Sequence, residues 1–401
     1  MASDPDLRPS SSPPASERMM EAARRELAMG GLRSMSFRRL GEAAGTTAGA
    51  LTYHLGAKAQ ILSDVVEAER ARDRAWHGAW LARFAALDRL DATAVATLLE
   101  HYLEAISRDD ARLTQMIWTD LLLRAPQDGD LQALMRPWFL ERRAFWSDLF
   151  EGRIADAAMW GPTCWAYTVD EGVHSLALAH DADYRLLRRL AVERLSHRLD
   201  PGRRGPLARA FSGLVERLDP GLDLPGRDRV SDLQAHGRRH DIALAACGLL
   251  LDEGVDGVTH RAVGERAGIP GSTVAYHFRG AADLTRAALA MVYLVAQGRA
   301  PAPAPAPDSF ERRAAVVVRG TLYFALAAAR NETLAAQAID LRRLRGENYV
   351  HTLREEGWTH IDGLDGQVAA LAGIGAAALS SVDGENRFDA LRSWLLVNLR
   401  N

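Results

Sequence analysis

The sequence is poor in cysteine, in lysine and in long apolar runs. Two cysteines, Cys164 and Cys247, occur in 401 residues, and neither has a partner at C-x-x-C spacing. This argues against a disulfide framework and a cysteine-based zinc site, and it fits a reducing cytoplasm. No stretch reaches the roughly 18 apolar residues of a membrane helix, and the polar N-terminus lacks the apolar segment of a signal peptide. We therefore expect a cytoplasmic protein without a membrane partner.

Signatures of catalysis are missing as well. The chain has no G-x-S-x-G, no Walker A loop, no dinucleotide fingerprint and no H-E-x-x-H motif. Asp170, Glu171 and His174 could form a metal or acid–base cluster, but on one helix such residues more often form a solvated or capped face. We predict no enzyme, no cofactor and no metal site. The net charge of −3 excludes a global basic field, so any binding to nucleic acid must depend on local patches.

Strand signals are nearly absent. Apolar residues recur at three- and four-residue spacings between Gly and Pro breaks, which predicts an all-α fold. A chain of this length fits two to four domains. Outside the repeated segment described next, we expect helices at about 62–84, 91–108, 111–124, 129–151, 162–180, 183–199 and 207–218, and again at 308–330, 331–345, 347–356, 364–382 and 386–399.

A stretch beginning near Glu17 recurs 223 positions later, near His240, without a gap. The first repeat (17–62) and the second repeat (240–285) each hold 46 residues. This period is far longer than the roughly 20–50 residues of a solenoid unit, so the chain consists of two similar proteins joined end to end. The 12 identical pairs are Ala22/Ala245, Ala23/Ala246, Leu27/Leu250, Gly31/Gly254, Arg38/Arg261, Gly41/Gly264, Glu42/Glu265, Ala44/Ala267, Gly45/Gly268, Tyr53/Tyr276, His54/His277 and Ala59/Ala282.

Each repeat is expected to form three helices with a tight turn before the last. In the first repeat, Ser36 is placed to cap the second helix and Gly45 to end it with a positive φ. Thr259 and Gly268 occupy the same places in the second repeat, where Pro270 suits the first turn of the last helix. Two short helices around a turn that contains Gly predict a helix-turn-helix, whose last helix can enter the DNA major groove.

Four motifs carry a family resemblance. They are Arg38-Arg39-Leu40-Gly41-Glu42-Ala43-Ala44-Gly45 and Leu51-Thr52-Tyr53-His54-Leu55 in the first repeat, and Ala262-Val263-Gly264-Glu265-Arg266-Ala267-Gly268 and Val274-Ala275-Tyr276-His277-Phe278 in the second. In these segments the chain resembles the tetracycline-repressor (TetR) family of transcriptional regulators. The resemblance implies DNA-facing residues at Phe37, Arg38, Ala48, Gly49, Ala50, Thr52, Tyr53, His54 and Lys58, and at His260, Arg261, Gly271, Ser272, Thr273, Ala275, Tyr276 and His277.

The two repeats differ in charge. The first has seven basic and four acidic residues, a balance of +3, whereas the second has three basic and six acidic, a balance of −3. Lys58, the only lysine in the chain, lies where the family uses a phosphate contact, and Ala281 takes its place in the second repeat. Phosphate neutralisation supplies much of DNA affinity. We therefore predict that the first repeat binds DNA more strongly than the second.

The resemblance and the breaks together predict a domain division. It comprises a disordered tail (1–16), helix-turn-helix domain 1 (17–62), helical regulatory domain 1 (63–199, the first body), a linker (200–237), helix-turn-helix domain 2 (238–285) and helical regulatory domain 2 (286–401, the second body). The last two helices of each body resemble the family's dimerisation pair. Two assemblies remain open, an intramolecular pseudo-dimer with an asymmetric operator, and a homodimer of tandem chains that offers four DNA-binding helices.

Five of the nine tryptophans fall between positions 118 and 165. An aromatic wall with a few polar groups describes a pocket for a flat or apolar small molecule, although a core of bulky side chains is the alternative. The candidate ligand-binding residues are Trp118, Asp120, Trp138, Trp146, Trp165, Tyr167, Asp170 and His174. The sequence thus predicts a repressor that an effector releases from a double-stranded DNA operator. A ligand-sequestering or partner-binding protein with weakened DNA binding is the alternative.

Overall fold

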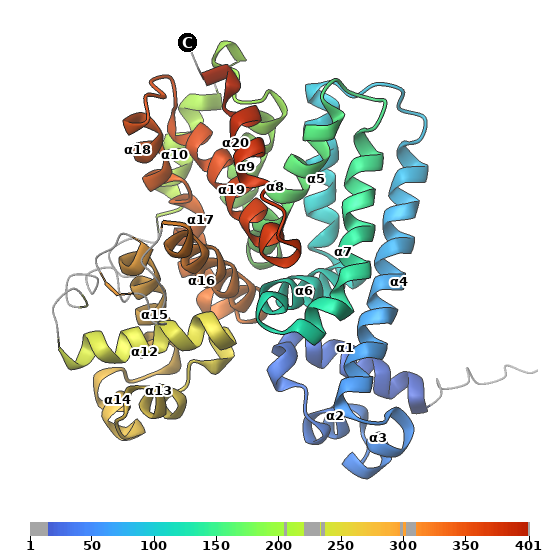
Figure 1. The fold of residues 1–401 in the computed structure, drawn as a ribbon, viewed down its shortest axis with the longest axis vertical. Helices are drawn as coiled ribbons and strands as arrows, with labels where there is room; N and C mark the ends of the chain where they lie inside the picture. The colour runs from blue at the N-terminus through green and yellow to red at the C-terminus, as the bar shows by residue number, and fades with distance from the viewer. Residues whose placement is uncertain are drawn as a thin grey trace, which may run out of the picture. The chain divides into compact units, whose positions relative to one another are not determined.

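The computed structural model describes residues 15–203, 207–219, 233, 237–296, 300–301 and 310–399. Within these residues the chain forms α-helices and short 3₁₀ helices and no strand, which confirms the all-α prediction (Figure 1). The helices of the first half are α1 (Ala15–Ser34), α2 (Phe37–Ala44), α3 (Ala48–Leu55), α4 (Lys58–Phe84), α5 (Ala92–Ile106), α6 (Asp109–Arg124), α7 (Gly129–Phe150), α8 (Ala157–Leu178) and α9 (Ala182–Ser196).

The helices of the second half repeat this plan after one additional helix. These are α10 (Leu207–Arg217), α12 (Arg238–Glu253), α13 (His260–Ala267), α14 (Gly271–His277), α15 (Ala281–Ala296), α16 (Phe310–Arg330), α17 (Ala335–Arg343), α18 (Glu347–Glu355), α19 (Gly363–Asp383) and α20 (Phe388–Leu395). Helix α10 forms inside the predicted linker 200–237 and packs on α9. Most of the predicted tail 1–16 lies outside the described residues, and α1 begins at Ala15.

The chain divides into two compact units, Met1–Arg70 and Ala71–Asn401. The division falls inside α4, so the first unit holds α1, α2, α3 and the start of α4. In this unit the buried Arg24 side chain on α1 donates to Glu69 on α4 across 2.7 Å, which fixes the two helices against each other. The second repeat, by contrast, belongs to the same unit as the helices that follow α4.

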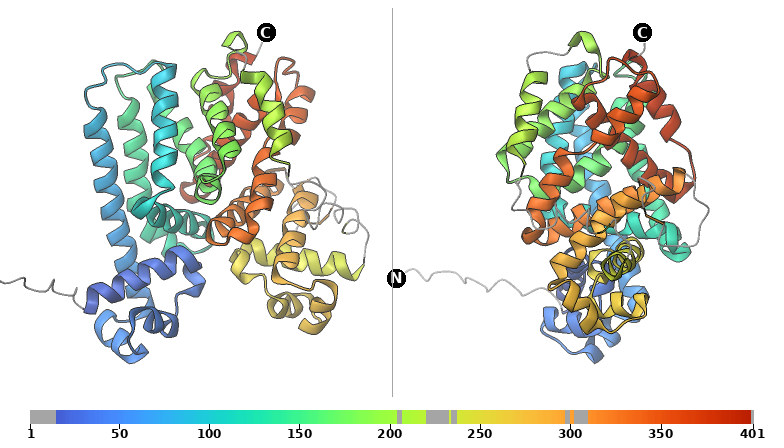
Figure 2. Two further views of the ribbon diagram at one scale, coloured as in Figure 1. Left: turned by 180° about the vertical axis from the view of Figure 1, so that it is seen from behind. Right: turned by 90° about the vertical axis from the view of Figure 1, so that its left-hand side faces the viewer.

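The second unit is built around α8 and α19, which pack against each other at the centre (Figures 1 and 2). A Cβ atom on Gly375 of α19 would lie 1.8 Å from the backbone oxygen of Ala166 on α8, so the two helix backbones touch there. Gly161 lets α8 approach α7 in the same way, with the Trp146 oxygen 2.7 Å from such a Cβ. The central contact therefore joins one body to the other. Among the described helices, none has the length and apolar content needed to cross a membrane.

Candidate nucleic-acid interface and pocket

The turn of the first repeat is shaped by local capping bonds. The Ser36 side chain accepts from the Arg39 amide at 3.4 Å and begins α2. Gly45 ends α2 in the left-handed region, at φ 63°. Thr47 then accepts from the Ala50 amide at 3.2 Å and begins α3. Capping residues at the ends thus keep each helix short. Helix α3 is a separate helix that buries Leu51 and Leu55 and exposes Thr52, Tyr53 and His54.

The second repeat has the same backbone. Helices α13 and α14 begin 223 positions after α2 and α3. Thr259 accepts from the Ala262 amide at 3.1 Å, and Gly268 ends α13 at φ 66°. The capping differs at both ends of the last helix. Pro270 stands in place of Thr47 and provides no side-chain bond to α14, and α14 ends at Phe278 with φ −134°, whereas α3 ends at Gly56 with φ 75°. The second repeat is therefore also a helix-turn-helix, and the turn between its two helices has the same geometry as in the first.

The predicted DNA-facing residues lie at the surface of both repeats. Tyr53 is 85% exposed and Tyr276 is 83% exposed, although large aromatic side chains are usually buried. Ala48 is the first residue of α3. The exposed residues are Arg38, Gly49, Thr52, Tyr53, His54, Lys58, Arg261, Ser272 and Tyr276, and the half-buried ones are Phe37, Ala50, His260, Gly271, Thr273, Ala275 and His277.

The charges on these surfaces differ between the repeats. Arg38 is matched by Arg261, and each pairs with the carboxylate four residues later, Glu42 at 3.3 Å and Glu265 at 2.8 Å. Such exposed pairs contribute little to stability, so both guanidinium groups can turn to a phosphate. Lys58 adds an exposed ammonium at the start of α4, where the second repeat has alanine.

Further polar groups of the second repeat are bound within the protein. The His260 ring lies 2.7 Å from the Phe278 backbone oxygen, and Arg266 donates to Asp252 at 2.7 Å. Side chains held in this way are less able to reach a nucleic acid. The second surface therefore keeps the scaffold of the first but offers fewer cationic groups.

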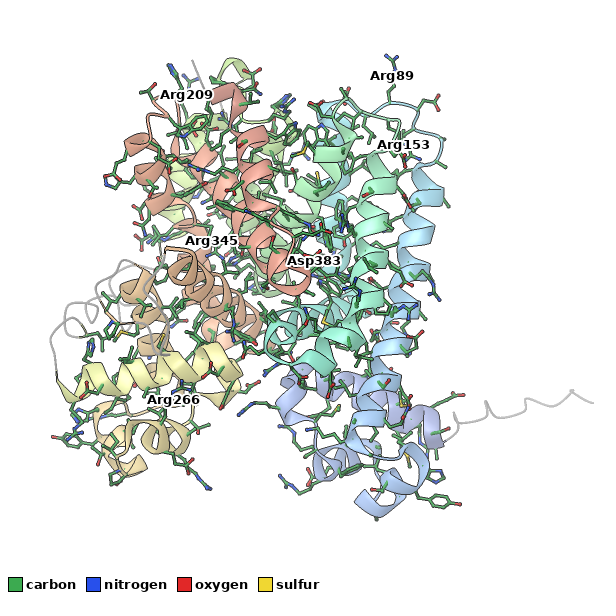
Figure 3. All side chains as sticks on the ribbon, viewed as in Figure 1. Arg89, Arg153, Arg209, Arg266, Arg345 and Asp383 are labelled. Carbon is green, nitrogen blue, oxygen red and sulfur yellow. The ribbon has the colours of Figure 1, made fainter. Side chains whose placement is uncertain are left out.

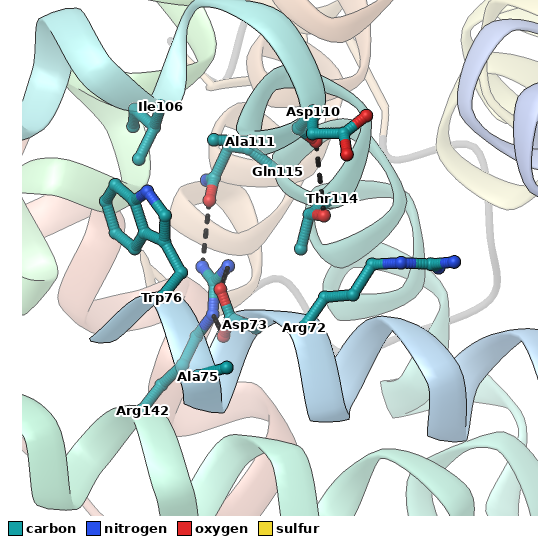
Figure 4. A pocket seen from close by; sticks show the side chains of 10 residues that line it. All are labelled: Arg72, Asp73, Ala75, Trp76, Ile106, Asp110, Ala111, Thr114, Gln115 and Arg142. Atoms are coloured by element: carbon teal, nitrogen blue, oxygen red, sulfur yellow. Dashed lines mark hydrogen bonds and ion pairs between the residues drawn. The ribbon is translucent and has the colours of Figure 1, made fainter. Parts of the chain in front are cut away.

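A pocket of about 290 Å³ opens in the first body, between α4, α5, α6 and α7 (Figure 4). This volume is near the lower end of small-molecule sites, which hold roughly 300–1,000 Å³. Trp76 provides a flat aromatic wall, and Arg72 and Asp110 are exposed at its edge. The lining residues are Arg72, Asp73, Ala75, Trp76, Ile106, Asp110, Ala111, Thr114, Gln115 and Arg142.

Asp73 and Arg142 form a neutral pair in the pocket wall. Two Arg142 nitrogens donate to the Asp73 carboxylate at 2.7 and 2.9 Å, and a third donates to the Gln115 side chain at 2.8 Å. Burial alone would raise the pKa of the Asp73 carboxyl, but Arg142 and His77 outweigh burial and hold this pKa far below its usual value. The carboxylate is therefore charged and already paired. These bonds leave the pocket suited to an aromatic or apolar molecule with a few polar edges.

The tryptophans predicted to bind a ligand lie behind this pocket or away from it. Trp118 and Trp138 enclose the Arg142 guanidinium, at 4.4 and 5.7 Å from their ring centroids. Trp146 packs on Tyr102 with ring centroids 4.8 Å apart. Trp165 packs on Phe139 at the same separation. All four tryptophans are at most 2% exposed, so the two behind Arg142 support the pocket wall and the other two fill the core.

The polar residues of the predicted ligand set lie elsewhere, where the two bodies meet. Asp120 pairs with Arg124 at 3.2 Å and with Arg330 of the second body at 3.5 Å. Asp170 accepts from Arg345 at 2.7 Å, at the place where Figure 3 labels Arg345. The remaining two residues are Tyr167, which donates to Glu171 at 3.1 Å, and His174, whose Nε2 lies 3.5 Å from Asp170.

Asp73, Trp76 and Arg142 were missed from sequence. Their signal is a polar residue every fourth position on one side of α4, Glu69, Asp73 and His77, all of them buried. Buried charges need partners. The spacing therefore indicated that α4 receives charged side chains from its neighbours, although the sequence does not say that Arg142 is one of them.

Comparison with known proteins identifies the first repeat. A family model described as bacterial regulatory proteins, tetR family, matches residues 19–65. The match takes in most of α1, all of α2 and α3, and the start of α4. No curated protein matches the chain. The interpretation of the second repeat rests on its identities with the first and on the backbone that the two repeats share.

Proposed function

The chain is a DNA-binding transcriptional regulator of the TetR family, and from this premise we propose that it is a repressor that a small molecule releases from its operator. The observation that carries the proposal is the surface of the first repeat. There an exposed short helix, α3, lies in one compact unit with two exposed cationic residues, Arg38 and Lys58. Basic groups beside a helix of this kind position it on the phosphate backbone while its side chains reach base edges.

Within α3, the side chains best suited to base edges are polar and exposed. Thr52, Tyr53 and His54 follow one another on the helix. A hydroxyl can donate to or accept from a base edge, and a histidine ring can do either as well. In the second repeat, Ser272 and Tyr276 are exposed on α14 in the same way. Because the residues differ, the two repeats prefer different half-sites, and the operator is asymmetric.

The tandem chain acts as an intramolecular pseudo-dimer. Arg342 of the second body grips Glu171 of the first with two bonds, at 3.0 and 2.6 Å, and both side chains are at most 1% exposed. Burial alone would raise the pKa of the Glu171 carboxyl, but Arg342 outweighs burial and lowers it, so the pair is ionised. An acidic residue on α8 faces a basic residue on α17, so each surface is complementary to the other body and not to a second copy of itself. This complementarity favours pairing within one chain over pairing of like bodies.

The pocket of the first body is the proposed effector site. Its Trp76 wall and its buried, already neutralised Asp73–Arg142 pair favour a flat uncharged molecule over an anion. Release of DNA requires that the effector bind one conformation better than the other. A molecule that separates α6 from α4 and α7 has this property, because all three helices line the pocket.

The function is tested by recovering genomic fragments on the immobilised full chain and measuring their binding by fluorescence anisotropy at several salt concentrations. We expect specific binding whose logarithm falls linearly with the logarithm of salt concentration. Adding a panel of planar aromatic compounds should release the DNA. If no fragment binds specifically at low salt, the regulator is excluded and sequestration becomes the better explanation. The acidic balance of the second repeat is the feature that favours that alternative.

The assembly is tested separately by sedimentation of the protein with its operator. A pseudo-dimer gives one chain per operator, and a homodimer of tandem chains gives two. The variant Gly375→Leu should disrupt the contact between α8 and α19, because the leucine side chain would collide with the Ala166 backbone. If Gly375→Leu leaves the operator affinity unchanged, the contact between α8 and α19 does not contribute to DNA binding.

A further inference from the structure

The first helix of the second repeat ends against both bodies. An α-helix leaves its last four carbonyl groups without partners in the helix. At the end of α12, Arg319 of α16 donates to the Leu251 oxygen. Arg124 of α6 donates to the Glu253 oxygen at 3.0 Å. One of these two caps thus comes from the second body and the other from the first.

Arg124 is held in place by groups from both bodies. Asp120, one turn earlier on α6, accepts from Arg124 at 3.2 Å and from Arg330 of α16 at 3.5 Å. The Arg124 guanidinium also lies 5.6 Å from the ring centroid of Tyr323 on α16. Burial raises the pKa of this tyrosine to about 12, so the ring stays neutral. The guanidinium therefore has a fixed place at the end of α12.

The turn after α12 leaves little room for adjustment. Gly254 has φ 77°, and a Cβ there would lie 3.3 Å from the Tyr323 ring and 3.5 Å from an Arg124 nitrogen. The next residues form a 3₁₀ turn, Val255–Gly257, which leads to α13. A shift of Arg124 would therefore act on the Glu253 carbonyl and through it on the Gly254 turn that leads to the helix-turn-helix.

Helix α6 links this contact to the pocket. Asp110, Ala111, Thr114 and Gln115 of its first two turns line the pocket, and Arg124 is its last residue. The distance along the helix axis from Gln115 to Arg124 is about 14 Å at the usual rise per residue. Figure 1 shows α6 beside α16, and the two helices are in contact. A helix moves largely as a rigid body, so displacement at one end appears at the other.

We propose that α6 couples the pocket of the first body to the helix-turn-helix of the second repeat, with Arg124 as the positioning residue. The coupling rests on the proposed role of the pocket as the effector site. In the tandem chain, the pocket of one half would thus control the DNA-binding helices of the other half. In a dimer of identical chains, each chain has its own pocket and such a coupling is not required. The coupling would regulate DNA binding by the second repeat. Because this repeat has few cationic groups, its contact with DNA is easier to release than that of the first repeat.

The coupling is tested by filling the pocket covalently in the full chain. Cys164 and Cys247 are 0% exposed, so the variant Ala111→Cys introduces the thiol that N-phenylmaleimide reaches under native conditions. Hydrogen exchange of the amides at the end of α12 is then measured with and without the label. We expect the label to change these exchange rates by about fivefold or more, the lower end of coupling between sites. Ala111→Trp, which occupies the same space without a label, should give the same pattern.

Two matched variants decide between coupling and simple support of α12. Arg124→Gln should remove the effect of the label on α12. Arg319→Gln removes the other cap and should raise exchange, yet leave the effect of the label intact. The proposal is overturned if the label still changes the exchange rates of α12 in Arg124→Gln. It is also overturned if both variants lose this change equally. The same holds if neither the labelled protein nor Ala111→Trp shows any change in α12 exchange. DNA binding of the same proteins separates the two proposals: altered α12 exchange with unchanged operator affinity leaves the coupling and removes the effector role of the pocket.

Discussion

The two repeats share a backbone and differ in what they place on it. Gly31 and Gly254 have φ of 74° and 77°, and Gly45 and Gly268 have φ of 63° and 66°. The charge balance nevertheless changes from +3 to −3 between them. Backbone geometry around the turn follows from the Ser36 and Thr259 caps and from these glycines, which both repeats retain, whereas surface charge is free to diverge because exposed side chains contribute little to stability. Shared structure in a duplicated chain therefore does not imply shared affinity.

Charge reversal in the first repeat should have the largest effect. Arg38→Glu together with Lys58→Glu puts two negative groups where phosphates approach, and we expect operator binding to be lost in the anisotropy assay. The milder pair Arg38→Gln and Lys58→Gln should lower the salt slope by about 1.8, from about 0.9 for each lost phosphate contact. Arg261→Glu should weaken binding less.

The control for these variants is Arg209→Glu, an exposed arginine on α10 outside both repeats (Figure 3). Its operator affinity should match that of the unaltered chain. If Arg261→Glu reduces affinity more than the double reversal in the first repeat, the ranking of the two repeats is wrong. The charge balance would then be a poor guide to which surface meets DNA.

The Glu171–Arg342 pair joins the two bodies, and breaking it should lower the free energy of unfolding more than breaking an exposed pair in a repeat. Glu171→Gln leaves a buried guanidinium without its counter-charge, which costs about 3–5 kcal/mol. Glu265→Gln breaks an exposed pair in the second repeat and should change stability by about 0.5 kcal/mol or less. Urea unfolding of the full chain measures both. Equal effects would mean that the pair between the bodies is solvated.

Sequence reasoning succeeded where structure is local. The caps at Ser36 and Thr259 and the left-handed glycines at Gly45 and Gly268 depend only on neighbouring residues, and each is found where the pattern placed it. The start of α8 was predicted five residues late, at 162. The helix begins at Ala157 and accommodates Pro162 inside.

Long-range partners could not be predicted in the same way. Asp170 and Glu171 looked like a solvated face on one helix, yet both are fully buried against Arg345 and Arg342, about 170 positions along the chain. The local spacing of these two carboxylates does not indicate which distant arginine each of them pairs with in the folded chain. The role of the tryptophan cluster could not be predicted from sequence either, because a pocket wall and a filled core have the same composition. The packing of Trp118 and Trp138 around Arg142 distinguishes the tryptophans of the pocket wall from those of the core.

Acid should weaken the contact between the bodies through His174. Burial lowers the pKa of this histidine, and the nearby Arg345 and Arg342 lower it further, although Asp170 opposes them. The folded chain therefore keeps His174 neutral, and its stability is complete above the unfolded pKa of about 6.5. Below that pH the unfolded chain binds a proton at His174 and the folded chain does not. The free energy of unfolding therefore falls by up to about 1.4 kcal/mol per pH unit.

This pH effect is measured as the difference in unfolding free energy between pH 7.5 and 5.5. His174→Gln should flatten part of the fall. The pKa values of Asp170 and Glu171 are held below their usual range, because Arg345 and Arg342 outweigh burial, so these carboxylates stay charged throughout that interval. A fall of the same size in His174→Gln would place the titrating group elsewhere.

Glycine replacement tests the shared backbone itself and should have the smallest effects. Gly45→Ala and Gly268→Ala each force alanine into the left-handed region in open space, at an expected cost of about 1 kcal/mol. Since φ is nearly the same at both positions, the two costs should be equal. Gly254→Ala should cost more, because its Cβ would also press on the Tyr323 ring at 3.3 Å. Hydrogen exchange of each repeat gives the local values, and unequal costs at Gly45 and Gly268 would mean that the repeats no longer share one turn.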